Sequence, residues 1–229
     1  MRWLAYMASR LLLELILALV ARTRVLHRER TLLPGGWMLA ANHISHFDPP
    51  FLGVACLRKM DWMTSKELYQ VPLLGGWMRA VDTFPVDREK PDRHSIRTAL
   101  ARLDSGRVVG MFPEGGIRDG ARSVLQGAPL RPGLSALVGM SGAPVIPCVI
   151  LGSDRLYARR MWLPFRRAQV YLNFGEPIRP TGAGKDARAA FDAAYTKAIQ
   201  DLLAELTTRF ALTGDDLPQP AERRKGREP

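Results

Sequence analysis

The sequence has few groups that could support redox or thiolate chemistry. Only two of its 229 residues are cysteines, Cys56 and Cys148, and each lies inside an apolar run without a second cysteine nearby. This scarcity excludes a disulfide framework and a thiolate zinc site. Both thiols are expected to be reduced and buried.

Acidic residues are also in deficit, with 22 Asp and Glu against 33 Lys and Arg, which gives a net charge of +11. A surface this basic favours anionic partners such as phospholipid headgroups, nucleic acid or acidic carrier proteins. No nucleic-acid partner is expected, because no strand or helix interleaves aromatic with basic residues. An apolar content of 47% over this length predicts one domain with a full core and leaves little room for two.

The chain has no clean transmembrane run, because Arg10 and Glu14 interrupt the apolar residues 3–20. Residues 1–30 carry six arginines against two glutamates, and arginines continue where a secretory signal would need small residues for cleavage. We therefore expect residues 1–30 to be a retained amphipathic or hydrophobic membrane helix that lies in or dips into one leaflet. The alternative is a core helix of the domain.

Short apolar strands alternate with helical patterns over residues 31–212, which predicts a single α/β domain with helices around a mostly parallel mixed sheet. The tail 213–229 has almost no apolar residues and is expected to be disordered. The expected strands are 37–41, 62–65, 83–86, 108–112, 145–151 and 169–174, and the expected helices are 51–57, 73–80, 94–103, 132–140 and 185–210.

A histidine and an aspartate stand five positions apart, as His43 and Asp48, in the segment that follows the first expected strand. Such a loop can fold the carboxylate onto one imidazole nitrogen and leave the other nitrogen free as a base. The segment supplies no nucleophile, so the proton would come from a substrate hydroxyl. His46 leaves a second interpretation open, in which His43, His46 and Asp48 are three ligands of a metal.

Three further loops place charged groups at the ends of expected strands. Lys66 follows one strand, Arg88 follows the next, and the turn Pro113-Glu114-Gly115-Gly116 with Arg118 follows a third. The glycines permit a tight backbone close to a ligand, and the cations suit a phosphate. Together these loops indicate a crevice at the strand ends of an α/β sheet.

In these residues the chain resembles the glycerolipid acyltransferases of the lysophosphatidate (1-acylglycerol-3-phosphate) acyltransferase type. The resemblance covers residues 37–175, with four blocks in the family's order and spacing. One departure is that the third block usually continues Thr-Arg-Ser, whereas this chain has Gly116-Ile117-Arg118. The blocks are Asn42-His43 through Asp48; Lys66-Glu67-Leu68 with Phe84-Pro85-Val86-Asp87-Arg88; Phe112-Pro113-Glu114-Gly115; and Ala143-Pro144-Val145-Ile146-Pro147.

The resemblance implies a glycerol-3-phosphate acyltransferase-like fold over 31–212 and acyl transfer without a cofactor, a metal or an acyl-enzyme. It implies that His43, oriented by Asp48, deprotonates the acceptor hydroxyl, which attacks the thioester of acyl-CoA or acyl-carrier protein. Arg88 and Lys66 would hold the acceptor phosphate, or Lys66 would polarise the thioester.

The remaining implied site residues belong to the third block. Glu114 and Gly115 would position the glycerol part of the acceptor, and Arg118 is the displaced arginine of the block. The implied partners are anionic phospholipid and a lysophospholipid acceptor at the cytoplasmic face of the inner membrane.

Other functions remain as alternatives. The acceptor could be glycerol 3-phosphate, another lysophospholipid or a lyso-amino-acid lipid, and a metal-dependent hydrolase could use His43, His46 and Asp48. A serine hydrolase is not expected, because Gly139-Met140-Ser141-Gly142-Ala143 lacks the last glycine of the nucleophile motif. A lipid-binding protein without enzymatic activity would have no need of the His–Asp pair.

Overall fold

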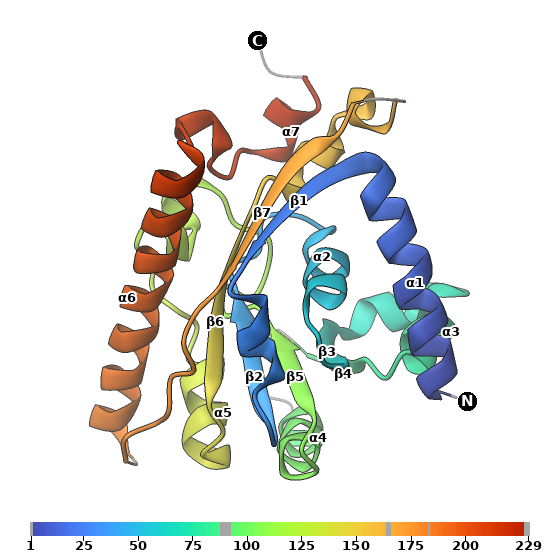
Figure 1. Cartoon of the computed structure of the whole chain (residues 1–229). Coiled ribbons are helices and arrows are strands. Elements are labelled where there is room, and N and C mark those ends of the chain that lie inside the picture. Colours follow the sequence, from blue (N-terminus) through green and yellow to red (C-terminus); the bar gives the residue numbers. More distant parts are fainter. Residues whose placement is uncertain (1, 88–92, 164–165, 183, 227–229) are drawn as a thin grey trace.

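A seven-stranded sheet forms the centre of the molecule, with helices against both faces (Figure 1). The computed structural model describes residues 2–87, 93–163, 166–182 and 184–226. The strands occur in the order β1-β7-β6-β2-β5-β3-β4 across the sheet. Their bounds are β1 Ala21–Leu26, β2 Trp37–Ala41, β3 Met60–Ser65, β4 Phe84–Val86, β5 Val108–Met111, β6 Val145–Leu151 and β7 Ala168–Phe174.

Five neighbouring strands, β6-β2-β5-β3-β4, are parallel to one another. β7 is antiparallel to β6, and β1 is parallel to β7, so these two run the opposite way. The mostly parallel sheet inferred from the sequence is confirmed. The five parallel strands bring their carboxyl ends to one edge of the sheet, where ligands of α/β proteins bind.

Both faces of the central strands are buried, which explains why β2 and β6 are apolar runs rather than alternating ones. In β2, Met38 and Ala40 pack into the core under α4, α5 and α6, whereas Trp37, Leu39 and Ala41 pack into the core under α1 and α2. The helices are α1 Arg2–Val20, α2 Asp48–Ala55, α3 Leu74–Ala80, α4 Arg93–Asp104, α5 Gly133–Ser141, α6 Lys185–Phe210 and α7 Ala221–Arg224.

The N-terminal segment differs from the expectation, because the helix ends at Val20 and residues 21–26 form the edge strand β1. Arg22 and Arg24 are exposed on this strand, and their charge made the segment resemble a basic flank. The boundary at residue 30 is therefore wrong: β1 belongs to the sheet through its pairing with β7.

Two arginines of the N-terminal segment bond the carboxyl end of α2. Arg10 donates to the carbonyl of Val54 (3.0 Å), and Arg28 donates to those of Ala55 (2.6 Å) and Val54 (3.0 Å). Cations at the carboxyl end of a helix satisfy its last carbonyls and oppose its dipole. These two arginines therefore dock α1 and η1 (Arg28–Leu32) on the end of α2.

The tail also differs from the expectation, because residues 213–226 are folded against the domain. They form the short helices η7 (Gly214–Asp216) and α7, and Arg224 Nε donates to the buried Asp154 Oδ2 at 2.6 Å. The expectation of disorder is wrong here, since ion pairs rather than apolar burial hold the segment. Residues 227–229 lie outside the described residues.

Candidate active site

Directly after β2, the side chain of Asn42 bonds the neighbouring strand β6 in place of a backbone pair. Asn42 is fully buried; its Nδ2 donates to the carbonyl of Ile150 (2.9 Å), and its Oδ1 accepts from the amide of Ile150 (2.8 Å). These two bonds hold the amide side chain on β6 as a backbone neighbour would be held. The next residue, His43, is thereby fixed at the edge where the parallel strands end.

His43 and Asp48 form the expected pair. His43 Nδ1 lies 2.8 Å from Asp48 Oδ2, and the same oxygen accepts the amides of Ile44 (2.7 Å) and Ser45 (2.9 Å). An ionised carboxylate only accepts hydrogen bonds, so the proton of the neutral imidazole belongs on Nδ1. Nε2 then carries the free lone pair of a general base.

An aromatic column fixes the plane of the imidazole. The His43 ring stacks on Phe112 with centroids 3.9 Å apart and planes at 12°, and Phe112 stacks on Trp62 at 5.2 Å. Trp62 stands on β3, and Phe112 directly follows β5. Aromatic side chains from β3 and from the end of β5 therefore fix the direction in which Nε2 points.

The third-block loop holds the backbone of His43 on both sides. Glu114 Oε2 accepts the amide of His43 at 2.5 Å, and the amide of Arg118 donates to the carbonyl of His43 at 2.8 Å. Glu114 Oε1 accepts the Ser123 hydroxyl (2.9 Å) and the Val124 amide (2.7 Å). Burial raises the pKa of Glu114, and these hydrogen bonds oppose the rise. Both oxygens have protein partners, so Glu114 acts on the site through His43.

Two arginines lie against the glycines of this loop. Gly115 has φ +67°, and a Cβ at this position would come within 2.7 Å of the Arg131 side chain, so a larger residue would displace that arginine. The Arg118 guanidinium lies beside Gly116. No carboxylate of the described residues pairs with Arg118 or Arg131, which leaves both cations available to an anion.

Of the two second-block cations, Lys66 directly follows β3. Lys66 Nζ donates to Asp87 Oδ2 at 2.6 Å, which ties the two strand ends together. Arg88, the expected phosphate ligand, lies outside the described residues.

His46 does not join His43 and Asp48 around a common point. Its Nδ1 lies 2.6 Å from the Tyr157 hydroxyl, on the loop after β6. In the part of the chain that the structure describes, no three His, Cys, Asp or Glu side chains are placed to hold a metal ion. The donors around Asp48 also occupy the oxygens that a metal would need.

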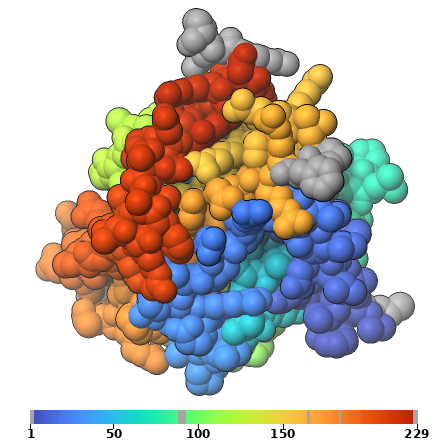
Figure 2. Space-filling view, turned by 45° about the horizontal axis from the view of Figure 1, so that its top comes forward, coloured from blue at the N-terminus to red at the C-terminus, as the bar shows by residue number. Residues whose placement is uncertain are grey.

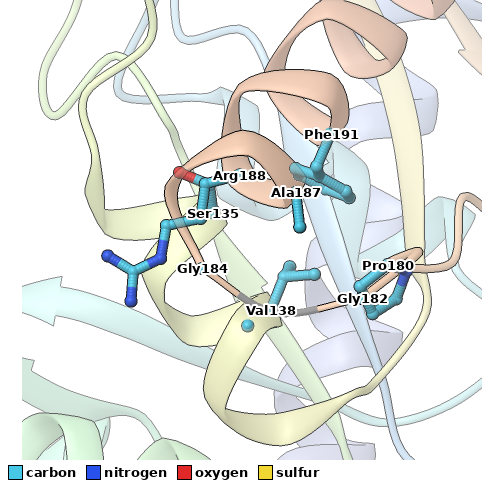
Figure 3. Close-up of a pocket in the computed structure, with 9 residues that line it drawn as sticks. Ser135, Val138, Pro180, Gly182, Gly184, Ala187, Arg188 and Phe191 are labelled. Atoms are coloured by element: carbon cyan, nitrogen blue, oxygen red, sulfur yellow. The ribbon is translucent and has the colours of Figure 1, made fainter.

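A separate shallow hollow lies between α5 and the start of α6 (Figure 3). Its walls include Val138, Ala187 and Phe191, and Figure 3 shows them beside the loop that precedes α6. None of the predicted site residues lines it. The hollow is therefore distinct from the strand-end site.

Comparison with known proteins agrees with this arrangement. A family model described as Acyltransferase matches residues 23–151, more than half of the chain. The chain belongs to the acyltransferase family. The match begins in β1 and ends with β6, so it contains both the dyad loop and the third-block loop.

Relatives and a solved structure are similar over most of this acyltransferase. The 1-acyl-sn-glycerol-3-phosphate acyltransferase of Bacillus subtilis is 28% identical over 199 residues, covering 86% of this chain and 94% of its own length. That of Streptococcus pneumoniae is 28% identical over 144 residues, 62% of this chain and 50% of the relative. The LPA acyltransferase PlsC of Thermotoga maritima has a TM-score of 0.60 at 20% identity, covering 84% of this chain and 80% of that one, which shows the shared fold.

Sequence reasoning missed four side chains around the dyad of this acyltransferase: Phe112 as the stacking ring, Arg131, Ser153 and Tyr157. Ser153 donates to Asp48 Oδ1, and Tyr157 meets His46. Phe112 stood in a quoted block without a role of its own. Arg131 and Ser153 gave no signal, because only the folded chain brings Arg131 beside Gly115 and Ser153 beside Asp48.

Proposed function

We propose that this acyltransferase moves an acyl chain from a thioester, acyl-CoA or acyl-carrier protein, to the free hydroxyl of 1-acyl-glycerol 3-phosphate, giving phosphatidic acid. The named activity of the Bacillus subtilis and Streptococcus pneumoniae relatives supports this acceptor. The observation that carries the proposal is a buried His–Asp pair in which His43 Nε2 has no partner among the described residues. The serines beside the pair, Ser45 and Ser153, bond Asp48 rather than Nε2, so neither is placed as a nucleophile.

In the proposed reaction, His43 Nε2 takes the proton of the acceptor hydroxyl as its oxygen attacks the thioester carbonyl. The tetrahedral intermediate collapses, the C–S bond breaks, and the leaving thiolate takes the proton back from His43. Asp48 holds the imidazole and stabilises the imidazolium that exists between these steps.

The cations supply acceptor binding in this proposal. Lys66 comes from the second block and Arg118 from the third, and both lie in loops at the strand-end edge that also carries His43. Arg88 is included because it belongs to the second block of the sequence. An arginine can bind a phosphate through two parallel hydrogen bonds, which fixes the glycerol hydroxyl relative to His43. Gly115 has no side chain, so the acceptor can approach the backbone of this loop closely.

The test is a substrate panel with the purified full chain. Lysophosphatidate, glycerol 3-phosphate, a lysophospholipid with a larger headgroup and a lyso-amino-acid lipid are each incubated with acyl-CoA and with acyl-carrier protein, and products are identified by mass. We expect phosphatidic acid to form with the highest kcat/KM. A higher kcat/KM for another acceptor would replace the proposed one, and chelator-sensitive donor hydrolysis without acceptor would favour the metal-dependent hydrolase.

We also propose that the enzyme works on the cytoplasmic face of the inner membrane, held there by α1. Among the described residues, one helical segment, Trp3–Val20, is long and apolar enough to cross a membrane, and only 11% of it is buried. The opposite side of α1 packs on α2 and β1, and Figure 1 shows the helix along one flank of the molecule. Its exposed apolar side chains are Trp3, Leu4, Met7, Leu11, Leu12, Leu15, Ile16 and Leu19.

A second exposed apolar element adjoins α1. Leu73 is 91% exposed at φ +65°, ψ −48°, and the amide of Leu74 bonds the carbonyl of Pro72 across it at 2.7 Å. This γ-turn is rare and strained for a residue with a Cβ. Trp77 Nε1 donates to Ser9 Oγ of α1 at 2.9 Å. We include this turn in the membrane-facing surface, because it presents a leucine to solvent beside the apolar helix.

A further inference from the structure

The loop after β6 touches the catalytic pair on one side and the C-terminal segment on the other. It contains Gly152 and η5 (Ser153–Tyr157). Gly152 has φ +82°, and a Cβ here would lie 2.1 Å from the carbonyl oxygen of Gln169, so only glycine lets the loop turn this closely over β7. Ser153 and Tyr157 face the dyad loop, while Asp154 and Arg155 face the tail.

The carboxylate of Asp48 is divided between two sets of donors. Its Oδ2 is filled by His43 and two amides of its own loop, as described above. Its Oδ1 accepts the hydroxyl of Ser153 from 105 residues away, and Ser45 Oγ is farther, at 3.4 Å. Ser45 Oγ donates to Ser153 Oγ at 3.1 Å, and the Ser153 hydroxyl donates its hydrogen bond to Asp48 Oδ1. Ser153 is completely buried.

The tail holds η5 through two ion pairs. Arg224 Nε donates to Asp154 Oδ2 at 2.6 Å, while Arg224 Nη2 reaches the carbonyls of Asp215 (3.0 Å) and Leu217 (3.2 Å). Arg155 pairs with Asp216. Asp154 is fully buried, and its Oδ1 has no partner among the described residues, so Arg224 is its main counter-charge. Figures 1 and 2 both show the red C-terminal residues beside the orange segment that follows β6.

We propose that Ser153 is a positioning residue that fixes the Asp48 carboxylate for His43, and that the C-terminal segment 213–226 holds Ser153 in place through the Arg224–Asp154 ion pair. The proposal rests on the proposed function in that it takes His43 as the base. A carboxylate bonded at both oxygens cannot rotate away from Nδ1. Without Ser153, Oδ1 loses its principal donor in a buried site and keeps only the longer contact from Ser45, so the carboxylate is held less firmly against Nδ1.

The kinetic test compares four variants of the full chain. Ser153→Ala should lower kcat about tenfold, as expected for one buried hydrogen bond to a charged group, with acceptor KM within twofold. Ser153→Thr, which keeps the hydroxyl, should restore most of kcat. Arg224→Gln should lower kcat several-fold, whereas its neighbour Arg223→Gln should not, because Arg223 bonds only to residues of the tail itself. Unchanged kcat in Ser153→Ala, or equal effects at Arg223 and Arg224, would overturn the proposal.

A double-mutant cycle separates positioning from a general effect on folding. In the Asp48→Ala background, Ser153→Ala should cost nothing further, because the group that it positions is gone. A further tenfold loss there would mean that Ser153 supports the fold rather than Asp48.

A spectroscopic readout keeps the proposal testable even if no acceptor is turned over. The proton NMR signal of the His43 Nδ1–H, identified by its absence in His43→Ala, should shift or broaden in Ser153→Ala and in Arg224→Gln and stay in place in Arg223→Gln. An inactive wild-type chain would reject the proposed function alone, whereas an unmoved signal in Ser153→Ala would reject the positioning role.

Discussion

His43 is held at nearly every atom that can be held. Glu114 accepts its amide, the Arg118 amide donates to its carbonyl, Asp48 bonds Nδ1, and the Phe112 ring covers one face of the imidazole. Nε2 is the one polar atom of His43 without a hydrogen-bond partner among the described residues. A catalytic base needs this combination of a fixed ring and one open nitrogen, since misplacement by about 1 Å can cost a hundredfold in rate.

Loss of the base or of its orienting carboxylate should abolish most of the activity. His43→Ala and Asp48→Asn should each lower kcat about a hundredfold or more and leave a folded chain, the usual range for a positioned general base. His46→Ala serves as the control and should have a far smaller effect, because His46 bonds Tyr157 on the other side of the loop. Circular dichroism checks the fold. An equal loss at His46 together with bound metal would contradict the dyad.

Glu114 should be required as a carboxylate. Its oxygens face the His43 amide, the Val124 amide and the Ser123 hydroxyl, so the amide of Glu114→Gln would set N–H against a donor. We expect kcat to fall about tenfold or more and the melting temperature to drop. Glu67→Gln is the control, since Glu67 is a surface residue bonded to Ser65.

The same carboxylate gives opposite pH trends to activity and to stability. Because burial raises the pKa of Glu114, the folded chain binds this proton more tightly than the unfolded chain. Its contribution to stability therefore falls as pH rises through the raised pKa, while activity falls as pH drops through it, because a protonated Glu114 accepts fewer bonds. Rates and melting temperatures, followed as the pH rises above 4.5, the ordinary pKa of a glutamate carboxyl, should diverge in wild type.

Arg88 should determine acceptor binding. If it binds phosphate through paired hydrogen bonds, Arg88→Lys should fail to rescue Arg88→Ala, because an ammonium lacks the planar fork. Acceptor KM should rise more than donor KM in both variants, measured by varying one substrate at a time. Equal changes for both substrates would remove Arg88 from the acceptor site.

At the scale of elements, strong apolar runs were predictable and charged segments were not. β2, β6 and α6 have the expected bounds. β2 and β6 are continuous apolar runs, and α6 has apolar residues at three- and four-residue spacing, so both patterns are visible in the sequence. The exposed arginines of β1 made an edge strand look like a basic flank in the sequence. The tail folds through ion pairs, which cannot be predicted from composition. The dyad and third-block loops were found as motifs. Arg131 and Ser153 were not, because the contact of Arg131 with the third-block loop and that of Ser153 with Asp48 depend on the path of the chain.

The turn at Leu73 allows a prediction in which stability and membrane binding move in opposite directions. Leu73→Gly removes the strain of φ +65° and should raise stability by about 0.5–1 kcal/mol. It also removes an exposed leucine and should weaken binding to vesicles. Thermal unfolding and vesicle flotation measure the two effects. Lower stability would contradict the strain, and unchanged flotation would remove the turn from the membrane-facing surface.

At the scale of the molecule, the apolar flank and the charge of +11 act together. Under the proposed function, the lipid acceptor is dissolved in a leaflet while the thioester donor is soluble, so we expect the site to open toward the bilayer. Because β1 follows α1 directly, removal of residues 1–24 would damage the sheet as well as the anchor. Substitutions on the exposed face of α1 avoid this problem.

To test the anchor, a double variant that carries both Leu11→Gln and Leu15→Gln is compared with the wild type. Met140→Gln on α5 is the control, because Met140 is an exposed apolar residue outside α1. The double variant should bind anionic vesicles less and lose activity on membrane-borne acceptor, while it still turns over a short-chain, water-soluble acceptor. High salt should release the wild type only in part, because screening weakens the attraction of the cations but leaves the buried apolar face. If salt alone strips the wild type completely, charge is the whole anchor; if the double variant binds as wild type does, α1 is not the anchor.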